Sequence, residues 1–417
     1  MKKIKANGLM TNTIMLYVLT FSNYFFNFIT VPYQTRVLGP VYYGRLGFAT
    51  AFMVYIQLFL DFGFLLSATE EVANFRNDKK AVSRIFSVVC WCKLILIAAS
   101  LIVLLILCGS VERFRSDSML FILYFVSTAV NSFLPDYLYR GLEDMKSITV
   151  RSVCIKLFFT VMIFVFLREP SQYYIVPLLN IIGNAGAVVF VYADLKKRVG
   201  VGFVKVSLKE VLQSLKRSSI FFYSRIASTV YSATNTFIMG FIYGDASPIV
   251  GYYTSADKLI TTAKQAITPV TDSLYPYMVR KKDFKLIRKL MMIGLPVMTA
   301  GCIGVWILAE PICGLLFGSE FVDSAKYLRL LIPAVWCSFP AMTFGFPVLS
   351  PMGLAKYANI SNIFGACIQI IQLIILYFAG GLTVEALCIA TCITEVCTLS
   401  FRVLVVFFNR KKLKTSV

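Results

Sequence analysis

Residues 94–111 read LILIAASLIVLLILCGSV, eighteen positions without one charged side chain. A helix of about 20 apolar residues crosses the ~30 Å hydrocarbon core of a bilayer, so this stretch predicts a membrane span. Similar runs recur along the chain, and 58% of its 417 residues are hydrophobic. Lipid offers the backbone no hydrogen-bond partner, and the runs are too long for barrel strands, so we expect an all-α polytopic membrane protein. About twelve spans are predicted, at residues 9–30, 43–67, 83–109, 118–139, 150–167, 173–193, 218–242, 249–278, 291–309, 327–349, 358–379 and 384–408.

The basic residues predict the orientation of these spans. Segment 194–217 holds seven Lys and Arg residues and segment 279–290 holds six, whereas segments 243–248 and 380–383 hold none. Cytoplasmic connections retain Lys and Arg, so both termini should be cytoplasmic and the number of spans even. The net charge of +20 follows from the same bias. Because that charge lies in short strips at helix ends, nucleic acid is not an expected partner.

The composition excludes several kinds of site. The chain has no His, which removes the commonest general base and most zinc sites. Its eleven Cys fall mainly in apolar runs, where we expect small buried hydrophobes. We therefore expect no metal site, no cofactor and no catalytic residue. The longest polar connection, about 194–217, is too short to build a separate soluble domain.

The sequence repeats weakly at half its length. Residues 37–44 (VLGPVYYG) and 242–252 (IYGDASPIVGY) both predict a tight turn between two spans, rich in Gly, Pro and aromatic residues. Residues 141–146 (GLEDMK) and 351–356 (PMGLAK) are a second pair of turns. The copies lie 205 to 210 positions apart, close to half of the chain. Chance similarity is the alternative explanation.

Such a repeat favours two parallel six-helix lobes around a central cavity, as in transporters whose halves are related by an axis along the membrane normal. The boundary should fall in the most highly charged connection. We therefore predict an N-terminal lobe at 1–198, a basic cytoplasmic linker at 199–217 and a C-terminal lobe at 218–417.

Ionisable side chains inside the predicted spans are the candidate functional residues. A charge at membrane depth costs a few kcal/mol or more, and it usually faces protein or water. Arg225, Lys258 and Lys264 are the expected cavity-lining cations, and they favour an anionic load. The candidates for an ion-coupling or cavity charge are Asp61, Lys156, Asp257, Asp272 and Glu395.

Structural roles compete with these functional ones. Lys93 and Arg402 are expected to reach the membrane interface with their long side chains. Asp61 serves equally well as a structural partner for a neighbouring Lys or as a proton or ion site. Lys258 and Lys264 lie about 240° apart around one helix, so the eighth span cannot hide all its charges on one seam. We expect it to border a broad watery cavity or to approach the surface at one end.

Motifs along nearly the whole chain form a recognisable pattern, most densely in the first 160 residues. They are residues 12–14 (NTI), 27–33 (NFITVPY), 35–40 (TRVLGP), 43–44 (YG), 61–63 (DFG), 67–73 (SATEEVA), 139–149 (YRGLEDMKSIT) and 251–259 (GYYTSADKL). Together they resemble bacterial O-antigen and polysaccharide repeat-unit flippases of the multidrug/oligosaccharidyl-lipid/polysaccharide exporter superfamily.

The resemblance implies a transporter rather than an enzyme. Its implied substrate is a polyprenyl-diphosphate-linked oligosaccharide, moved from the inner to the outer leaflet of the bacterial cytoplasmic (inner) membrane for O-antigen, capsule or exopolysaccharide synthesis. Alternating access is the implied mechanism. The lipid bilayer and polysaccharide assembly proteins are the implied further partners.

The resemblance also assigns residues. Arg36 lies in an Arg-x-x-Gly turn similar to one in the related lipid II flippases, which implies a place in substrate binding. Lys258 occupies the position of a basic residue in the family's eighth span, with the charge of Arg but without its two-pronged geometry. Glu70 and Glu71 stand where many relatives have a Thr-Arg-Glu run, and the two extra helices of the lipid II branch are not expected.

Two alternatives stay open from the sequence. A drug or cation exporter of the same superfamily would favour acidic groups in its cavity, against the cations Arg225, Lys258 and Lys264. A membrane polysaccharide polymerase or ligase commonly needs a large outward loop or a cytosolic catalytic segment, and the outward connections here are short. A scaffold for polysaccharide assembly is compatible with flipping.

Overall fold

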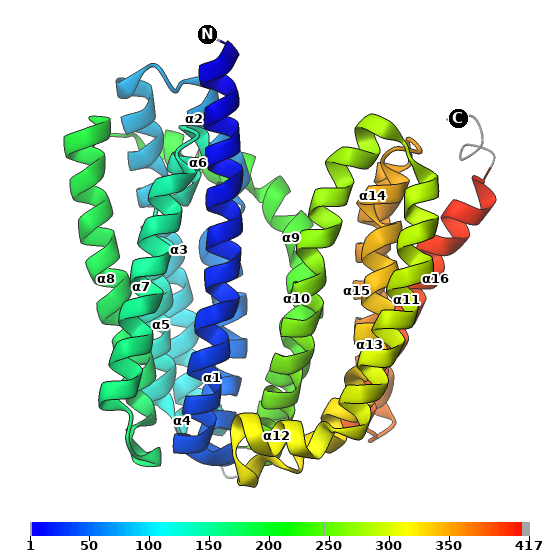
Figure 1. Cartoon of the computed structure of the whole chain (residues 1–417). Helices are drawn as coiled ribbons and strands as arrows, with labels where there is room; N and C mark the ends of the chain where they lie inside the picture. The colour runs from blue at the N-terminus through cyan, green and yellow to red at the C-terminus, as the bar shows by residue number, and fades with distance from the viewer. Residues whose placement is uncertain (1, 245–246, 411–417) are drawn as a thin grey trace. The chain divides into compact units, whose positions relative to one another are not determined.

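The computed structural model of the chain is built from α-helices (Figure 1). It describes residues 2–244 and 247–410, and these residues contain no β-strand. Asp245 and Ala246 of the second predicted turn therefore lie outside the described residues, as do the side chains of the first motif, residues 12 and 13. The all-α fold predicted from the apolar runs is confirmed.

The helices form two compact units. Unit 1 comprises Met1–Thr229 and Gly240–Ala246, and unit 2 comprises Val230–Met239 and Ser247–Val417. The lobe and linker boundaries expected from the charge pattern, at residues 198 and 218, stay a prediction.

Unit 1 holds the first eight α-helices, one 3₁₀ turn and one π-helical turn. They are α1 (Lys2–Asp61), α2 (Phe64–Asn74), α3 (Lys79–Ser110), α4 (Glu112–Arg115), α5 (Ser118–Ser132), α6 (Asp136–Gly141), α7 (Met145–Phe166), the 3₁₀ turn η1 (Pro170–Tyr174), α8 (Ile175–Asp194) and the π turn η2 (Leu195–Val199). Helix α9 (Leu208–Tyr243) contributes residues to both units.

Unit 2 holds the remaining helices. They are α10 (Ile249–Lys281), α11 (Phe284–Ile307), α12 (Ala309–Phe317), the 3₁₀ turn η3 (Ser319–Phe321), α13 (Ser324–Phe344), α14 (Phe346–Leu349), α15 (Ala355–Phe378) and α16 (Val384–Phe408). Within this unit α13 packs against α10, α11 and α16, and α15 packs against α16.

The described helices account for every predicted span. Within the described residues, nine helical stretches are long and apolar enough to cross a membrane. The first of these, Ile14–Asn74, overlaps two predicted spans, 9–30 and 43–67. The more polar α9 and α10 coincide with the predicted spans 218–242 and 249–278. The protein is a multi-pass membrane protein.

Side chains fix where many of these helices begin. Asp78 accepts hydrogen bonds from the backbone of Lys80 and Ala81 at the start of α3. Ser207 and Glu210 form a reciprocal capping box at the start of α9. Such caps satisfy backbone N–H groups that lack a partner in the first helical turn. These capping side chains therefore fix the residues at which α3 and α9 begin.

Helix α1 reverses direction at Gly39, which has φ 67° and ψ 174°. Before the reversal, Thr149 at the start of α7 donates to the Met15 carbonyl (2.9 Å). Tyr33 donates to the Leu167 carbonyl just past the end of α7 (2.7 Å). Residues 15–33 therefore run parallel to α7.

After the reversal the chain runs alongside α5. Arg45 Nη1 lies 3.4 Å from Asp117 Oδ2 at the start of α5, and Asn131 near its end donates to Gln57 (3.5 Å). Tyr173, just beyond α7, donates to the same Asp117 (2.7 Å). The two parts of α1 are thus antiparallel spans, and the tight turn predicted at 37–44 is confirmed.

The same backbone geometry occurs again between α9 and α10. Gly244 has φ 75° and ψ −175°, close to the values of Gly39, and lies 205 positions further along the chain. An L-residue with a side chain rarely adopts this φ, whereas glycine does so without steric cost. The two predicted turns therefore share one backbone conformation at a glycine, which is Gly39 in the first turn and Gly244 in the second.

The second pair of turns also matches. Glu143 and Gly353, 210 positions apart, have φ 61° and φ 73°. Each precedes by two residues the first residue of a helix, Met145 of α7 and Ala355 of α15. These matches support the internal repeat that the sequence predicted.

Candidate functional site

The predicted charge Asp61 lies at a break in a membrane helix. It is the last residue of α1, and Phe62 (φ 39°) and Gly63 (φ 80°) leave the helical conformation before α2 begins. A Cβ at Gly63 would come within 2.7 Å of the Phe221 Cβ and 2.8 Å of the Ser218 carbonyl oxygen. Glycine therefore permits both the bend and the close approach of α9. The tripeptide Asp61-Phe62-Gly63 is thus an interruption of a helix.

Asp61 pairs with a predicted cation within unit 1. Arg225 Nη1 on α9 lies 3.7 Å from Asp61 Oδ2, and the two side chains are 35% and 28% exposed. Gln57, one turn earlier on α1, donates to Asp61 Oδ1 (2.8 Å). A separation of 3.7 Å is too long for a strong hydrogen bond, so the pair is held mainly by charge. Two candidates from distant parts of the sequence therefore meet.

A second pair of candidates meets in unit 2. Lys264 Nζ on α10 lies 2.6 Å from Glu395 Oε1 on α16, with side chains 17% and 12% exposed. This distance is typical of a charge-assisted hydrogen bond. Burying either charge alone would be costly, so the positive charge of Lys264 and the negative charge of Glu395 stabilise each other in the interior of unit 2.

A buried polar network lies beside this pair, and the sequence reasoning missed it. Asn235 on α9 donates to Thr391 on α16 (2.7 Å) and accepts from Gln369 on α15 (3.0 Å). Thr394 donates to Gln369 (2.7 Å), and Asn235 also donates to Tyr253 on α10 (3.3 Å). Amide side chains in otherwise apolar spans were the available signal, because a buried amide requires hydrogen-bond partners.

The network and the ion pair share one helix. Thr391 and Glu395 are four residues apart on α16, and therefore lie on the same face of it. Thr394 immediately precedes Glu395. Four helices of unit 2 thus supply polar groups to one region of its interior.

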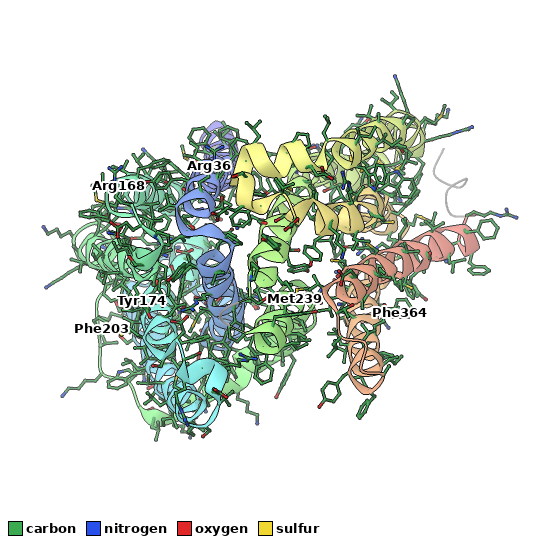
Figure 2. All side chains as sticks on the ribbon, turned by 90° about the horizontal axis from the view of Figure 1, so that it is seen from below. Arg36, Arg168, Tyr174, Phe203, Met239 and Phe364 are labelled. Atoms are coloured by element: carbon green, nitrogen blue, oxygen red, sulfur yellow. The ribbon has the colours of Figure 1, made fainter. Side chains whose placement is uncertain are left out.

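The other candidates are more dispersed. Asp257 and Lys258 on α10 are half-buried, and neither side chain forms a hydrogen bond or ion pair with the described part of the chain. Asp272 is exposed and Lys156 on α7 is half-buried. Arg36 is exposed on α1, three residues before the reversal (Figure 2). Their proposed roles remain predictions.

Lys93 and Arg402 do not reach the membrane interface, so that expectation is wrong. They are 5% and 8% exposed. Lys93 donates to the carbonyl of Ser132, the last residue of α5, and Arg402 donates to the carbonyl of Ala341 in the last turn of α13 (2.5 Å). The last carbonyls of a helix lack an intrahelical donor, and these two cations supply it.

Residues 9–282 match the family described as "Polysaccharide biosynthesis protein". Two relatives are each named "Putative O-antigen transporter". The one from Escherichia coli strain K12 is 30% identical over 64% of each chain, and the one from Shigella dysenteriae is 25% identical over 90% of this chain and 96% of its own. The match thus spans just under two thirds of the Escherichia coli relative.

Solved structures share the fold. An inward-closed lipid II flippase MurJ superposes with a TM-score of 0.74 and 12% identity, over 95% of this chain and 87% of its own. An inward-facing multidrug resistance MATE family transporter of the MOP superfamily gives a TM-score of 0.68 and 15% identity, over 97% and 98%. The fold is therefore that of MATE and MurJ transporters. Because the family match covers more than half of the sequence, the chain belongs to the polysaccharide biosynthesis protein family.

Proposed function

We propose that this protein is a flippase that moves a polyprenyl-diphosphate-linked oligosaccharide across the cytoplasmic membrane, from the inner to the outer leaflet. The observation that carries the proposal is the presence, at membrane depth, of cations held by carboxylates: Arg225 by Asp61, and Lys264 by Glu395. Support also comes from relatives named as O-antigen transporters and from the fold shared with a lipid II flippase.

The chemistry of such a load explains the cations. A diphosphate loses its hydration shell when it enters the hydrocarbon core, and other polar groups must then replace the lost water. Guanidinium and ammonium groups replace part of that shell with charge-assisted hydrogen bonds. The polyprenyl tail is apolar and can remain in lipid throughout. Arg36 and Lys258 are the further cations that we assign to the head group.

Ion pairs provide a way to bind and to release. In the proposed cycle the diphosphate displaces the carboxylate from the cation that it contacts, Asp61 from Arg225 in unit 1 or Glu395 from Lys264 in unit 2, and the carboxylate reclaims its cation when the head group leaves. The exchange keeps each cation partnered in both states, which avoids the cost of a lone buried charge. Because the substrate competes with a built-in anion, binding stays weak enough for release during alternating access.

The orientation is part of the same proposal. Both termini face the cytoplasm, since the connections on that side are the basic ones. The diphosphate head group would then be collected on the basic side of the membrane. Surface polysaccharide synthesis, of O-antigen, capsule or exopolysaccharide, is the pathway that such a step would serve.

The test is transport in proteoliposomes. Purified protein should move fluorescently labelled lipid-linked repeat units between leaflets faster than empty vesicles do. Arg225→Ala and Lys258→Ala should each slow transport about tenfold or more, since each removes a contact worth about 1.5–3 kcal/mol. Lys209→Ala, an exposed lysine in the first turn of α9, is the matched control and should transport normally.

Two results would overturn the proposal. One is no movement above empty vesicles by protein that elutes as a monodisperse, folded species. The other is normal transport by Arg225→Ala, Lys258→Ala and the double variant. Efflux of cationic dyes without movement of lipid-linked sugars would assign the protein to drug export instead.

A further inference from the structure

A lateral cavity of about 750 Å³ lies between α7 and α8 of unit 1. Its wall is mostly apolar, with Val150, Cys154 and Phe158 from α7 and Ile182 and Phe190 from α8. Four of these five, Val150, Cys154, Ile182 and Phe190, are exposed at the surface of the unit. Because α7 and α8 are both membrane helices, an apolar cavity with exposed lining residues on this flank is accessible to lipid tails.

One end of the cavity is charged. Lys146, Arg151 and Arg198 line it together with Asp144 and Asp194. Arg198 binds both carboxylates, Asp144 at 2.8 Å and Asp194 at 2.9 Å. These ion pairs join the start of α7 to the end of α8 and neutralise most of their own charge.

Lys146 and Arg151 are the cations that remain for a ligand. Lys146 is exposed and forms no ion pair with the described residues. Arg151 is 6% exposed, and its Nη2 lies 2.6 Å from Asp136 Oδ1. Its Nε and Nη1 are buried without a hydrogen-bond partner among the described residues. A buried guanidinium with unused donors requires an acceptor, and a phosphate oxygen at the charged end would supply one.

Glycines keep the apolar part open. A Cβ at Gly186 on α8 would meet no atom within 4 Å, although this residue lines the cavity. At Gly183, one turn earlier, a Cβ would just touch Ile155 and Phe158 at 3.4 Å. The helices are thus in contact at Gly183 and apart at Gly186. A side chain at position 186 would fill the cavity without displacing the backbone.

The length of the cavity matches one leaflet. From Lys146 to Phe158, α7 rises about 18 Å, at 1.5 Å per residue. Half of a ~30 Å hydrocarbon core is about 15 Å. A lipid whose phosphate lay at the charged end could therefore lay one acyl chain along the cavity as far as the middle of the bilayer.

We infer that this cavity binds an anionic phospholipid, with its phosphate at Lys146 and Arg151 and one acyl chain between α7 and α8. Charge selects the occupant: an unpaired lysine and a half-paired arginine favour a net negative head group over a zwitterionic one. This site is separate from the Asp61–Arg225 pair, and the inference does not depend on the proposed transport.

Native mass spectrometry of the full chain tests the inference. Protein purified in detergent is incubated with equal amounts of phosphatidylglycerol and phosphatidylcholine, and the bound lipid is counted. The wild-type protein should retain one molecule of phosphatidylglycerol in preference to phosphatidylcholine. Gly186→Trp should lower its retention about tenfold by filling the cavity, and Lys146→Ala should lower it several-fold.

Two matched controls separate the site from general effects. Lys356 is the second residue of α15, as Lys146 is of α7, and it too is exposed, so Lys356→Ala should retain lipid as wild type does. Gly301 on α11 also has no atom within 4 Å of an added Cβ, so Gly301→Trp should leave retention unchanged.

A second measurement needs no variant. Phosphatidylglycerol with a photoreactive acyl chain should crosslink to peptides that contain residues 150–158 or 182–190. Three outcomes would overturn the inference: equal retention of phosphatidylcholine, undiminished retention by Gly186→Trp, or crosslinks confined to other helices. Displacement of the phospholipid by an equimolar polyprenyl phosphate would assign the cavity to the isoprenoid tail and would also overturn it.

Discussion

Lys264 and Glu395 form a 2.6 Å ion pair across α10 and α16, beside the network of Asn235, Gln369 and Thr394. Neither charge would be stable there alone, since the cost of taking an ion out of water is repaid only by a well-placed partner. The pair and the network together concentrate the polar groups of unit 2 in one place. That concentration makes the region sensitive to single substitutions.

The ion pair predicts strong coupling between its two members. Lys264→Met or Glu395→Leu should each lower the free energy of unfolding by about 3 kcal/mol, because each leaves one buried charge without a partner. The double variant should lose less than the sum of the two. Unfolding in mixed micelles measures this cycle, and additive losses would show that the two charges do not interact.

Asp61 is expected to couple transport to an ion. Asp61→Asn keeps the shape of the side chain and its contact with Gln57, but removes the charge that holds Arg225. Transport by this variant should lose its dependence on an imposed ion gradient while a basal rate persists. Asp323→Asn, at an exposed position in unit 2, is the control. Unchanged ion dependence in Asp61→Asn would exclude Asp61 from coupling.

Gly63 should tolerate no side chain. Gly63→Ala places a Cβ at φ 80° and within 2.7 Å of Phe221. The left-handed conformation costs about 1–2 kcal/mol, and overpacking adds about 1–3 kcal/mol. Gly380→Ala has a similar φ of 64° but no atom within 4 Å, so it isolates the first cost. In thermal unfolding, Gly63→Ala should therefore have a much lower melting temperature than Gly380→Ala. Equal decreases in melting temperature would contradict a packing role for Gly63.

Gln369 should be the most sensitive member of the amide network. Gln369→Leu leaves the Asn235 carbonyl oxygen and the Thr394 hydroxyl without this partner, at about 1–3 kcal/mol for each unsatisfied group. Gln372, one turn along α15, is half-buried and bonds only one member of the network, Thr394 at 2.9 Å. Gln372→Leu should therefore cost less. The reverse order in chemical unfolding would show that the network contributes little stability.

Much of the fold could be predicted from the sequence, because a backbone that crosses lipid must form all its hydrogen bonds internally. Runs such as 94–111 had to become helices, and α3 covers nearly all of that one. The turn at Gly39 was also predictable, because a Gly-Pro pair, Gly39 and Pro40, lies between two apolar runs. The π turn at Leu195–Val199 was not predicted, and Arg198 within it forms ion pairs with Asp144 and Asp194 that the hydropathy pattern does not indicate.

The site was only half predictable. Charges inside spans identified Asp61, Arg225, Lys264 and Glu395 as residues of interest, but not which of them meet. Partners in space are set by helix packing, which a hydropathy pattern does not encode. The expectation for Lys93 failed for a related reason: the carbonyl that receives it, at Ser132, is offered by the end of another helix.

The matched turns also carry a historical consequence. Gly39 and Gly244 repeat one backbone conformation, and the turns at Glu143 and Gly353 repeat another. Independent origin of both pairs at nearly the same offset is improbable on geometric grounds. Gene duplication of an ancestor about half as long accounts for them, and the glutamate at 143 against glycine at 353 then marks a position where the two descendants have since diverged.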